Sequence, residues 1–325
     1  MITFIKQFFR RIGLLAPLLD LLFLPLVIFS SLWFRLIKFI GLKKFTLTKY
    51  VFNKVGVFPI VKHYYEPQFD FSTYKQEYRN LQGIDFNLSV QTELLESFHF
   101  QDELLEKPIE SVSKPTYYYN NGSFSSGDAE CYYSLIRKFK PKRIIEIGSG
   151  YSTLIAHEAI IENNKENQSV QTQLTCIEPY EMPWLSQIDV NLIREKVEDI
   201  GTEFFKQLET GDILFIDSSH MIRPQGDVIY EVLEILPQLN SGVLIHFHDI
   251  FSPLNYPEKW LKEEFRLWNE QYLIEAFLSH NSEFEIIVAM SYLTQHCNDK
   301  MHSAFPVFKK QNPNGMPGSL WLKKR

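Results

Sequence analysis

Short apolar runs alternate with longer amphipathic stretches from about residue 128 to the end of the chain. The short runs are rich in β-branched residues, which predicts strands buried on both faces, and the longer stretches predict helices. The predicted strands are 143–147, 174–177, 191–193, 213–216 and 243–246, and the predicted helices are 128–139, 152–162, 202–209, 226–236 and 258–279. Two further strands, 284–289 and 319–322, follow with no strong helix between them and predict a hairpin-like pair. We therefore predict an α/β fold with a doubly wound, mostly parallel, seven-stranded Rossmann-like sheet.

The start of the chain follows a different pattern. Residues 14–34 contain one charged residue, Asp20, and are long enough to cross the roughly 30 Å hydrocarbon core of a bilayer as a helix. A cleaved signal peptide is disfavoured, because the apolar run is too long and no small-residue cleavage site follows it. Two membrane interpretations stay open: a helix that spans the bilayer despite Pro17, Pro25 and Asp20, or helices broken near the prolines that lie in one leaflet. A buried helix of a soluble core is the third alternative, and the flanking basic residues argue against it.

Charge divides the chain in the same place. Residues 1–50 hold eight Lys or Arg and one Asp, a net +7, and the other 275 residues hold 25 basic and 38 acidic residues, a net −13. The total of −6 argues against a nucleic-acid partner, whereas a basic apolar front end fits anionic lipid headgroups. If the helix spans, five basic residues on its C-terminal side against three on its N-terminal side place the rest of the chain in the cytoplasm. Both membrane interpretations predict the cytoplasmic face of the membrane, which is the inner membrane in a bacterium.

We expect three regions along the chain. Residues 1–45 form a membrane-associated helical segment, residues 46–116 an accessory region, and residues 117–325 the main α/β domain. The accessory region has no clean period apart from a predicted helix near 88–105, and the sequence does not specify its role. Three widely spaced cysteines do not make a disulfide framework or a zinc site. No pattern indicates the oligomeric state.

The first predicted strand of the main domain ends in a glycine turn. Glu146 lies in the strand, and Gly148, Ser149 and Gly150 lead into the next helix. Glycines let a ligand approach the backbone closely and a helix N-terminus presents unpaired N–H groups, so a nucleotide would suit this turn. Thr153 stands where the dinucleotide-binding fingerprint has its third glycine. A tight turn without a ligand is the alternative.

Carboxylates follow the next two strands. Glu178 ends the second strand, where a carboxylate can accept hydrogen bonds from two ribose hydroxyls. Glu198 and Asp199 follow the third strand, where a polar side chain could meet an adenine amine. The alternative for each residue is a solvated surface acid, and that alternative is strongest for Glu198 and Asp199.

Ionisable residues gather after the fourth and fifth strands. The fourth strand runs into Asp217 and His220, and the fifth runs into His248 and Asp249. Because the carboxyl ends of parallel strands share one edge of a sheet, we expect these four side chains to converge in one cleft. Four ionisable groups in one cleft would be costly without a task, which predicts a catalytic role. His246 lies two residues before His248 on the fifth strand and is interpreted as a core residue.

Taken in order, these motifs resemble those of class I S-adenosylmethionine-dependent methyltransferases. The matching features are Glu-x-Gly-x-Gly at 146–150, Glu178, Phe-Ile-Asp-x-x-His at 215–220, His-Asp-Ile at 248–250 and a reversed final strand at 318–322. The resemblance covers residues 117–325, and within that superfamily it is similar to the bacterial sugar and small-molecule O-methyltransferases. It implies S-adenosyl-L-methionine as the cofactor and a methylated hydroxyl as the product.

The resemblance also implies roles for the cofactor side of the site. The methionine part of the cofactor would lie against Glu146, Gly148, Ser149 and Gly150, its ribose against Glu178, its adenine near Glu198 or Asp199, and its sulfonium near Asp217.

On the acceptor side, His220, Asp217, Asp249 and His248 are the predicted catalytic residues. Some relatives bind a divalent cation through an Asp and a later acidic pair, which correspond here to Asp217, His248 and Asp249, and a histidine in that set suits a softer metal or none. His220 corresponds to the general base of such relatives, and an imidazole with an ordinary pKa of about 6.5 can take a proton from an acceptor hydroxyl.

We therefore predict a membrane-associated O-methyltransferase that acts on a sugar, glycolipid, lipid-linked intermediate or small molecule. One alternative is a metal-dependent hydroxylase on the same fold, and another is a non-catalytic membrane-bound scaffold. A nicotinamide-dependent oxidoreductase is disfavoured by Thr153 and by the reversed final strand. The sequence alone does not identify the acceptor.

Overall fold

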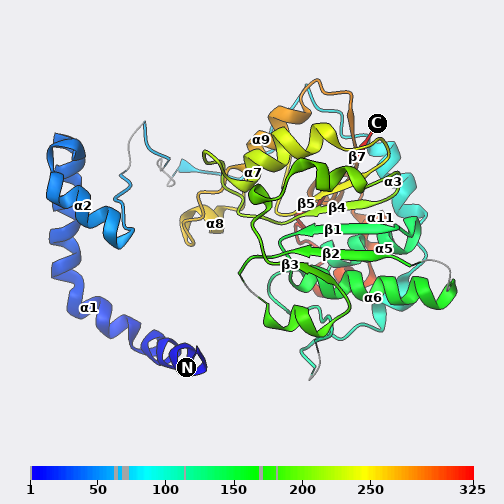
Figure 1. Ribbon diagram of the computed structural model, residues 1–325, viewed down its shortest axis with the longest axis horizontal. Coiled ribbons are helices and arrows are strands. Elements are labelled where there is room, and N and C mark those ends of the chain that lie inside the picture. The colour runs from blue at the N-terminus through cyan, green and yellow to red at the C-terminus, as the bar shows by residue number, and fades with distance from the viewer. Residues whose placement is uncertain (1, 62–64, 68–72, 113–114, 168–170, 181) are drawn as a thin grey trace. The chain divides into compact units, whose positions relative to one another are not determined.

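The computed structural model describes residues 2–61, 65–67, 73–112, 115–167, 171–180 and 182–325. The chain divides into two compact units, Met1–Tyr74 and Lys75–Arg325 (Figure 1). This boundary lies inside the expected accessory region 46–116, so the first part of that region belongs to the N-terminal unit and the second part to the unit that contains the sheet. The functional division into three regions stays a prediction.

The N-terminal unit is helical. α1 (Ile2–Ile40) is followed by a short 3₁₀ helix, η1 (Leu42–Lys44), and by α2 (Thr46–Val55). α1 continues through Pro17 and Pro25, so the structure does not have helices broken near the prolines. The segment Leu15–Ile40 has the length and composition of a membrane span, with a mean hydropathy of 2.1, and its apolar 18-residue stretch contains no buried residue.

A seven-stranded sheet organises the C-terminal unit, in the order β3-β2-β1-β4-β5-β7-β6. The strands are β1 (Arg143–Ile147), β2 (Gln173–Ile177), β3 (Asn191–Ile193), β4 (Ile213–Ile216), β5 (Leu244–Phe247), β6 (Phe284–Ala289) and β7 (Leu320–Lys324). β1 to β5 are parallel, and β7 runs antiparallel to both β5 and β6. The predicted fold class and the reversed final strand are therefore confirmed. The strand order changes direction between β1 and β4, and ligands of open α/β sheets bind at such a switch point.

Helices cover both faces of the sheet. Figure 1 shows α5 (Asp128–Phe139) and α6 (Tyr151–Glu166) on one side and α7 (Asp227–Tyr230) and α9 (Glu270–Leu278) on the other. Successive strand residues point to opposite faces, so Ile144 belongs to the core under α5 and α6, and Ile145 to the core under α7 and α9. α7 continues as a π-helix (Glu231–Ile235) and a 3₁₀ turn, η7 (Leu236–Gln238).

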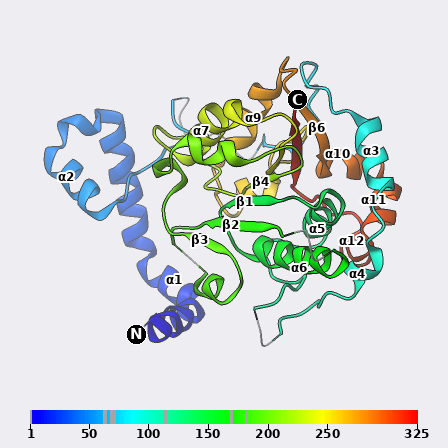
Figure 2. The same cartoon turned by 45° about the vertical axis from the view of Figure 1, so that its right-hand side comes forward.

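Short helices complete the unit. Figure 2 shows α3 (Leu88–Glu96), α10 (Met290–His296) and α11 (Asn298–Ala304) grouped beside β6. The remaining elements are α4 (Gln101–Leu105), α8 (Glu258–Lys262), α12 (Pro306–Gln311), and the 3₁₀ turns η3 (Pro183–Gln187), η4 (Val197–Asp199) and η5 (Thr202–Gln207).

The predicted helix over 258–279 is wrong. The structure has α8 and α9 with an irregular stretch between them, in which Phe265 has a φ of 54° that a right-handed helix excludes. The guanidinium of Arg266 lies 4.6 Å from the ring centroid of Trp260 and 4.7 Å from that of Trp268. Of the predicted stripe, Phe265 and Trp268 lie in this stretch, where Phe265 is 63% exposed and Trp268 packs on Trp260 with ring centroids 5.1 Å apart.

Three smaller predictions also differ from the structure. The region 88–105 forms two helices, α3 and α4, and 202–209 forms only the 3₁₀ helix η5. β6 and β7 pair in antiparallel fashion as predicted, but three short helices, α10 to α12, lie between them in the chain.

Candidate active site

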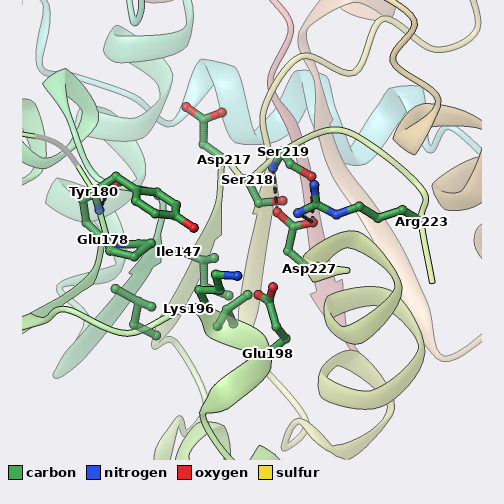
Figure 3. A pocket seen from close by; sticks show the side chains of 14 residues that line it. Ile147, Glu178, Tyr180, Lys196, Glu198, Asp217, Ser218, Ser219, Arg223 and Asp227 are labelled. Carbon is green, nitrogen blue, oxygen red and sulfur yellow. Dashed lines mark hydrogen bonds and ion pairs between the residues drawn. The ribbon is translucent and has the colours of Figure 1, made fainter. Parts of the chain in front are cut away.

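A cleft of about 400 Å³ opens beside the carboxyl ends of β1, β2 and β4 (Figure 3). This volume lies within the range of small-molecule sites. Its lining residues are Ile147, Gly148, Ile177, Glu178, Pro179, Tyr180, Lys196, Val197, Glu198, Asp217, Ser218, Ser219, Arg223 and Asp227. The cleft is thus part apolar and part charged, as a ligand with a flat apolar ring and polar groups would need.

The glycine turn forms one wall of this cleft. Gly148 has a φ of 78°, and a Cβ atom there would overlap the backbone oxygen of Asp217. The Gly148 N–H donates to the Ile177 carbonyl at 3.0 Å, and the Asp217 N–H donates to the Ile147 carbonyl at 2.9 Å. β1, β2 and β4 are therefore joined at the turn, and only glycine permits this approach.

Glu178 lies across the turn from Gly148. Its Oε2 accepts the N–H of Ser149 at 3.3 Å, and its Oε1 accepts the N–H of Tyr180 at 2.9 Å. Glu198 also lines the cleft, whereas its neighbour Asp199 is exposed and does not. Of the two residues that the sequence offered for this position, the geometry favours Glu198. Figure 3 shows Glu198 and Lys196 at one end of the cleft and Asp217 at the other.

Glu146 does not line the cleft. It is fully buried beneath the turn, where its carboxylate accepts hydrogen bonds from the hydroxyls of Tyr132 at 3.1 Å and Thr153 at 2.5 Å. The Thr153 oxygen in turn accepts the N–H of Gly150 at 3.0 Å. Burial raises the pKa of Glu146 to about 7, against the effect of these hydrogen bonds. Thr153, where a dinucleotide site has glycine, thus links a buried acid to the turn.

The four predicted catalytic side chains converge. His220 Nε2 lies 3.3 Å from Asp217 Oδ1 and 3.7 Å from Asp249 Oδ2. His248 Nδ1 lies 3.6 Å from an oxygen of each of the same two carboxylates. Asp217 also lines the cleft and one-third of its side chain is exposed, whereas both histidines are buried. Asp217 is therefore the residue that joins the cleft to this cluster.

Unusual backbone conformations hold the cluster in place. His220 and Asp249 both have a φ of 58°, in the left-handed region that residues other than glycine rarely adopt. The carbonyl of His220 accepts the N–H of Asn269 at 3.1 Å, and the Asn269 Oδ1 accepts the N–H of Ile222 at 2.6 Å. Strained residues of this kind cluster at functional sites, because the surrounding structure must stabilise them.

A residue that sequence reasoning missed completes the cluster. Glu270, at the start of α9, accepts a hydrogen bond from His220 Nδ1 at 2.8 Å and is buried. Its other oxygen, Oε1, has no hydrogen-bond partner among the described residues. The ring of Trp268 packs on His220 with the ring centroids 4.2 Å apart. No local motif marks Glu270, since it lies 50 positions beyond His220.

The charges of the cluster follow from these contacts. Burial alone would lower the pKa of His220, but the hydrogen bonds to Asp217 and Glu270 raise it to about 10. Desolvation would raise the pKa of Asp217, but His248 and His220 lower it well below its usual range. His220 is therefore an imidazolium at neutral pH. This corrects the expectation of an imidazole with an ordinary pKa, because the sequence placed Asp217 near the ring but did not show Glu270.

The predicted metal ligands do not form a metal site. Among the described residues, no group of three or more His, Cys, Asp or Glu side chains is arranged to hold a metal ion. The nitrogen of His248 that faces Asp217 and Asp249 is in ion-pair contact with both, and its Nε2 lies 3.9 Å from Asp128 Oδ2. The imidazole of His248 is thus held by carboxylates on both of its ring nitrogens.

Several other lining residues were not predicted. Ser219 donates its hydroxyl to Asp227 Oδ1 at 2.7 Å, and Arg223 lies 3.6 Å from the same oxygen. Ser218 and Ser219 lie inside the Asp-x-x-His motif and could have been proposed from it. The others, Tyr180, Lys196, Arg223 and Asp227, follow strands without a recognisable spacing.

Residues 145–250, about a third of the chain, match a model of the family Methyltransf_24, which is described as a methyltransferase domain. The chain is also 36% identical over 134 residues to an uncharacterized protein from Archaeoglobus fulgidus. That match covers 39% of this chain and 59% of the relative, so the chain spans about three fifths of the relative's length.

Two solved structures are similar at lower levels. An O-methyltransferase from Bacillus cereus in complex with SAH is 11% identical, with a TM-score of 0.35, over 73% of this chain and 91% of that one. The TDP-rhamnose 3'-O-methyltransferase CalS11, an enzyme in calicheamicin biosynthesis, is 11% identical, with a TM-score of 0.39, over 75% of this chain and 99% of that one. Similarity at these levels says nothing about the activity of this chain.

Proposed function

We propose that the C-terminal unit is an S-adenosylmethionine-dependent methyltransferase that methylates an oxygen of its acceptor. The observation that carries this proposal is the position of Asp217. Its side chain lines the cleft beside the glycine turn and also contacts His220, in the buried cluster next to the cleft. One carboxylate thus adjoins both a space for a nucleoside ligand and a group that can handle a proton. The matched methyltransferase-domain model over residues 145–250 covers these elements.

The residues of the cleft fit this cofactor. Glu178 is a strand-end carboxylate, the usual acceptor for two ribose hydroxyls, and Glu198 can accept an adenine amine. Ile177, Pro179 and Val197 supply apolar surface for the adenine ring. Asp217 supplies a negative charge for a sulfonium, and Gly148 leaves the turn open to a close approach. Glu146, buried beneath, holds the turn rather than the ligand.

A bound sulfonium supplies the methyl group for an in-line displacement. His220 Nε2 is the site through which we route the acceptor proton. Because Asp217 and Glu270 stabilise the imidazolium, Nε2 must first pass its proton to solvent, by way of the partly exposed Asp217 carboxylate, before it can accept the proton of the acceptor hydroxyl. A second positive charge beside Asp217 lowers the pKa of His220 by repulsion, so occupation of the cleft favours the basic form of His220.

Asp249 and His248 support this role from the other side. Asp249 Oδ2 lies 3.7 Å from His220 Nε2, so its carboxylate adds to the negative charge that faces the ring. His248 balances the charge of Asp217 and Asp249 in place of a metal ion. We assign no step to a metal, because the donor arrangement does not fit one.

We further propose that α1 attaches the enzyme to the cytoplasmic face of a membrane. Its exposed apolar stretch and the lysines that follow it support this attachment. A membrane location favours a glycolipid or lipid-linked acceptor over a freely diffusing one, and an unanchored sugar or small molecule is the alternative.

The test is transfer of radiolabelled methyl groups from S-adenosylmethionine by the full chain, added to lipid, glycan and small-molecule fractions of the host cell. Label is expected in a product that releases labelled methyl iodide on ether cleavage with hydriodic acid. Bound iron with oxygen-dependent product and no affinity for S-adenosylhomocysteine would instead identify a hydroxylase. If the chain neither binds the cofactor nor turns over any acceptor, a non-catalytic scaffold is the remaining explanation.

A further inference from the structure

We propose that the outer face of α2 is a second lipid-contact surface, which lies flat in the headgroup region of an anionic bilayer. The proposal rests on the proposed membrane attachment and assigns a role to a segment outside residues 1–45. It concerns the residues Leu47, Tyr50, Val51 and Val55, which we call the α2 stripe.

The α2 stripe is apolar and exposed. Leu47 is 83% exposed, Tyr50 61%, Val51 51% and Val55 66%. Spacings of three and four residues place these side chains along one side of the helix. Four large apolar side chains on one exposed side of a short helix indicate a surface that another apolar phase covers.

Aromatic contacts outside the α2 stripe pack α2 against α1. Phe52, which is only 6% exposed, packs edge to face with Phe34 of α1, with ring centroids 5.4 Å apart. Phe45, just before α2, packs against Trp33 at 6.1 Å. The α2 stripe is therefore held next to the last turns of the candidate span Leu15–Ile40, where a tryptophan suits the membrane interface.

The positive charge in and around α2 favours an anionic membrane surface as the partner. Residues 42–55 contain four lysines, Lys43, Lys44, Lys49 and Lys54, and no acidic residue. Lysines close to an anionic membrane surface are attracted to it. Lys54 extends over the Tyr50 ring, with its ammonium 5.8 Å from the ring centroid, so its stem covers the apolar stripe while its charge can reach headgroups.

The length of α2 determines its orientation. Ten residues of helix measure about 15 Å, which is half of what crossing the hydrocarbon core needs. A short helix with one apolar side and flanking lysines is the pattern of an interfacial helix. We therefore assign the bilayer, and not a protein, as the occupant of this surface.

The experiment is a spin-label scan of α2 in the full chain, reconstituted in vesicles of phosphatidylcholine and phosphatidylglycerol. Single cysteines replace Leu47, Val51 and Val55 on the stripe and Lys49 and Asn53 on the other exposed side, in a Cys297→Ser background. Cys131 and Cys176 are buried and stay. The ratio of oxygen to water-soluble nickel accessibility is expected to be at least about threefold higher on the stripe than at 49 and 53.

Equal nickel accessibility at all five positions would overturn the proposal. Protection of the stripe from both reagents would also overturn it, in favour of a protein partner. A second measurement uses the unlabelled variant Leu47→Gln/Val51→Gln/Val55→Gln, whose folding is checked by circular dichroism. Its Trp33 fluorescence is expected to be quenched less by shallow brominated lipids than that of the parent chain.

Sedimentation, nickel accessibility and S-adenosylhomocysteine binding together distinguish failure of this inference from failure of the earlier proposals. If the full chain sediments with vesicles but the stripe is accessible to nickel, this inference alone fails. If the chain does not sediment, the proposed attachment through α1 fails. S-adenosylhomocysteine binding by the same sample tests the methyltransferase proposal independently of both results.

Discussion

The two halves of the sheet edge use acidic residues in opposite ways. Beyond β2 and β3 the carboxylates of Glu178 and Glu198 line an open cleft. At β4 and β5 the side chains of His220, His248 and Asp249 are packed into mutual ion pairs with little exposure. The first half is shaped to receive a ligand and the second to hold charge, and Asp217 belongs to both.

The largest expected effect comes from the charged half. His220→Ala should lower kcat by about 10²- to 10⁴-fold, because the proton of the acceptor loses its route. The dissociation constant for S-adenosylhomocysteine should stay within about threefold, since His220 does not line the cleft. Steady-state kinetics and calorimetry give the two quantities. His296→Ala, at an exposed position, is the control, and equal loss of binding in His220→Ala would contradict the assignment.

Cofactor binding in the open cleft should be disrupted most directly at the glycine turn. Gly148→Ala should weaken cofactor binding by about 100-fold or more, because the new Cβ overlaps the Asp217 carbonyl and the φ of 78° becomes strained. Gly201→Ala is the control, since nothing lies within 4 Å of a Cβ there. Thermal unfolding of both variants separates a binding effect from a loss of folding. Normal affinity in a folded Gly148→Ala protein would refute the turn as a binding element.

A third substitution tests the contact that positions His220 in the buried cluster. Glu270→Gln should lower kcat by about 10- to 100-fold with little change in KM, because the amide keeps the shape but not the charge that holds His220 Nδ1. Glu231→Gln removes another buried carboxylate, one that hydrogen-bonds Ser218 instead of the histidine, and should have a much smaller effect. Equal effects in both variants would indicate that Glu270 acts through general stability.

Loss of a single charge in the open cleft should have a smaller effect on cofactor binding. Glu178→Gln should raise the dissociation constant for the cofactor by about tenfold, the cost of one charged hydrogen-bonding group. Asp199→Asn, on the same side of the molecule but outside the cleft, should leave it unchanged. Calorimetric titration of both variants is the measurement, and a larger effect in Asp199→Asn would contradict the placement of Asp199 outside the binding site.

The smallest effect is expected from metal removal. Because His248 already lies between the carboxylates of Asp217 and Asp249, dialysis against EDTA should leave kcat within about twofold. Loss of activity that returns on addition of a single divalent metal would show that the ion pairs rearrange around a cation.

The sequence predicted the parts of the molecule that local rules determine. Seven strands, their direction and the meeting of Asp217, His220, His248 and Asp249 follow from strand patterns and from the common edge of a parallel sheet. The continuous helix over 258–279 was wrong, because the aromatic residues there pack on Arg266 and on one another instead of on a helix stripe.

The charge state of the site could not be predicted in the same way. It depends on Glu270, whose distance from His220 is set by the packing of α9 and not by any spacing in the chain. Glu146 illustrates the same limit, because its motif predicts contact with a ligand but its hydroxyl partners come from α5 and α6. Charge and contact depend on tertiary structure, whereas the strands and the sheet edge at which their end residues meet are readable from pattern.

The position of β7 has a consequence for how the site is assembled. β7 lies between β5 and β6 in the sheet, and β6 reaches the other strands only through it. Asp128 binds the N–H groups of Gly318 and Ser319, at 3.1 and 2.8 Å, just before β7 and beside His248. The environment of His248 is therefore completed only when residues 318–324 are in place, so a change that displaces β7 would disturb the buried cluster as well as the sheet.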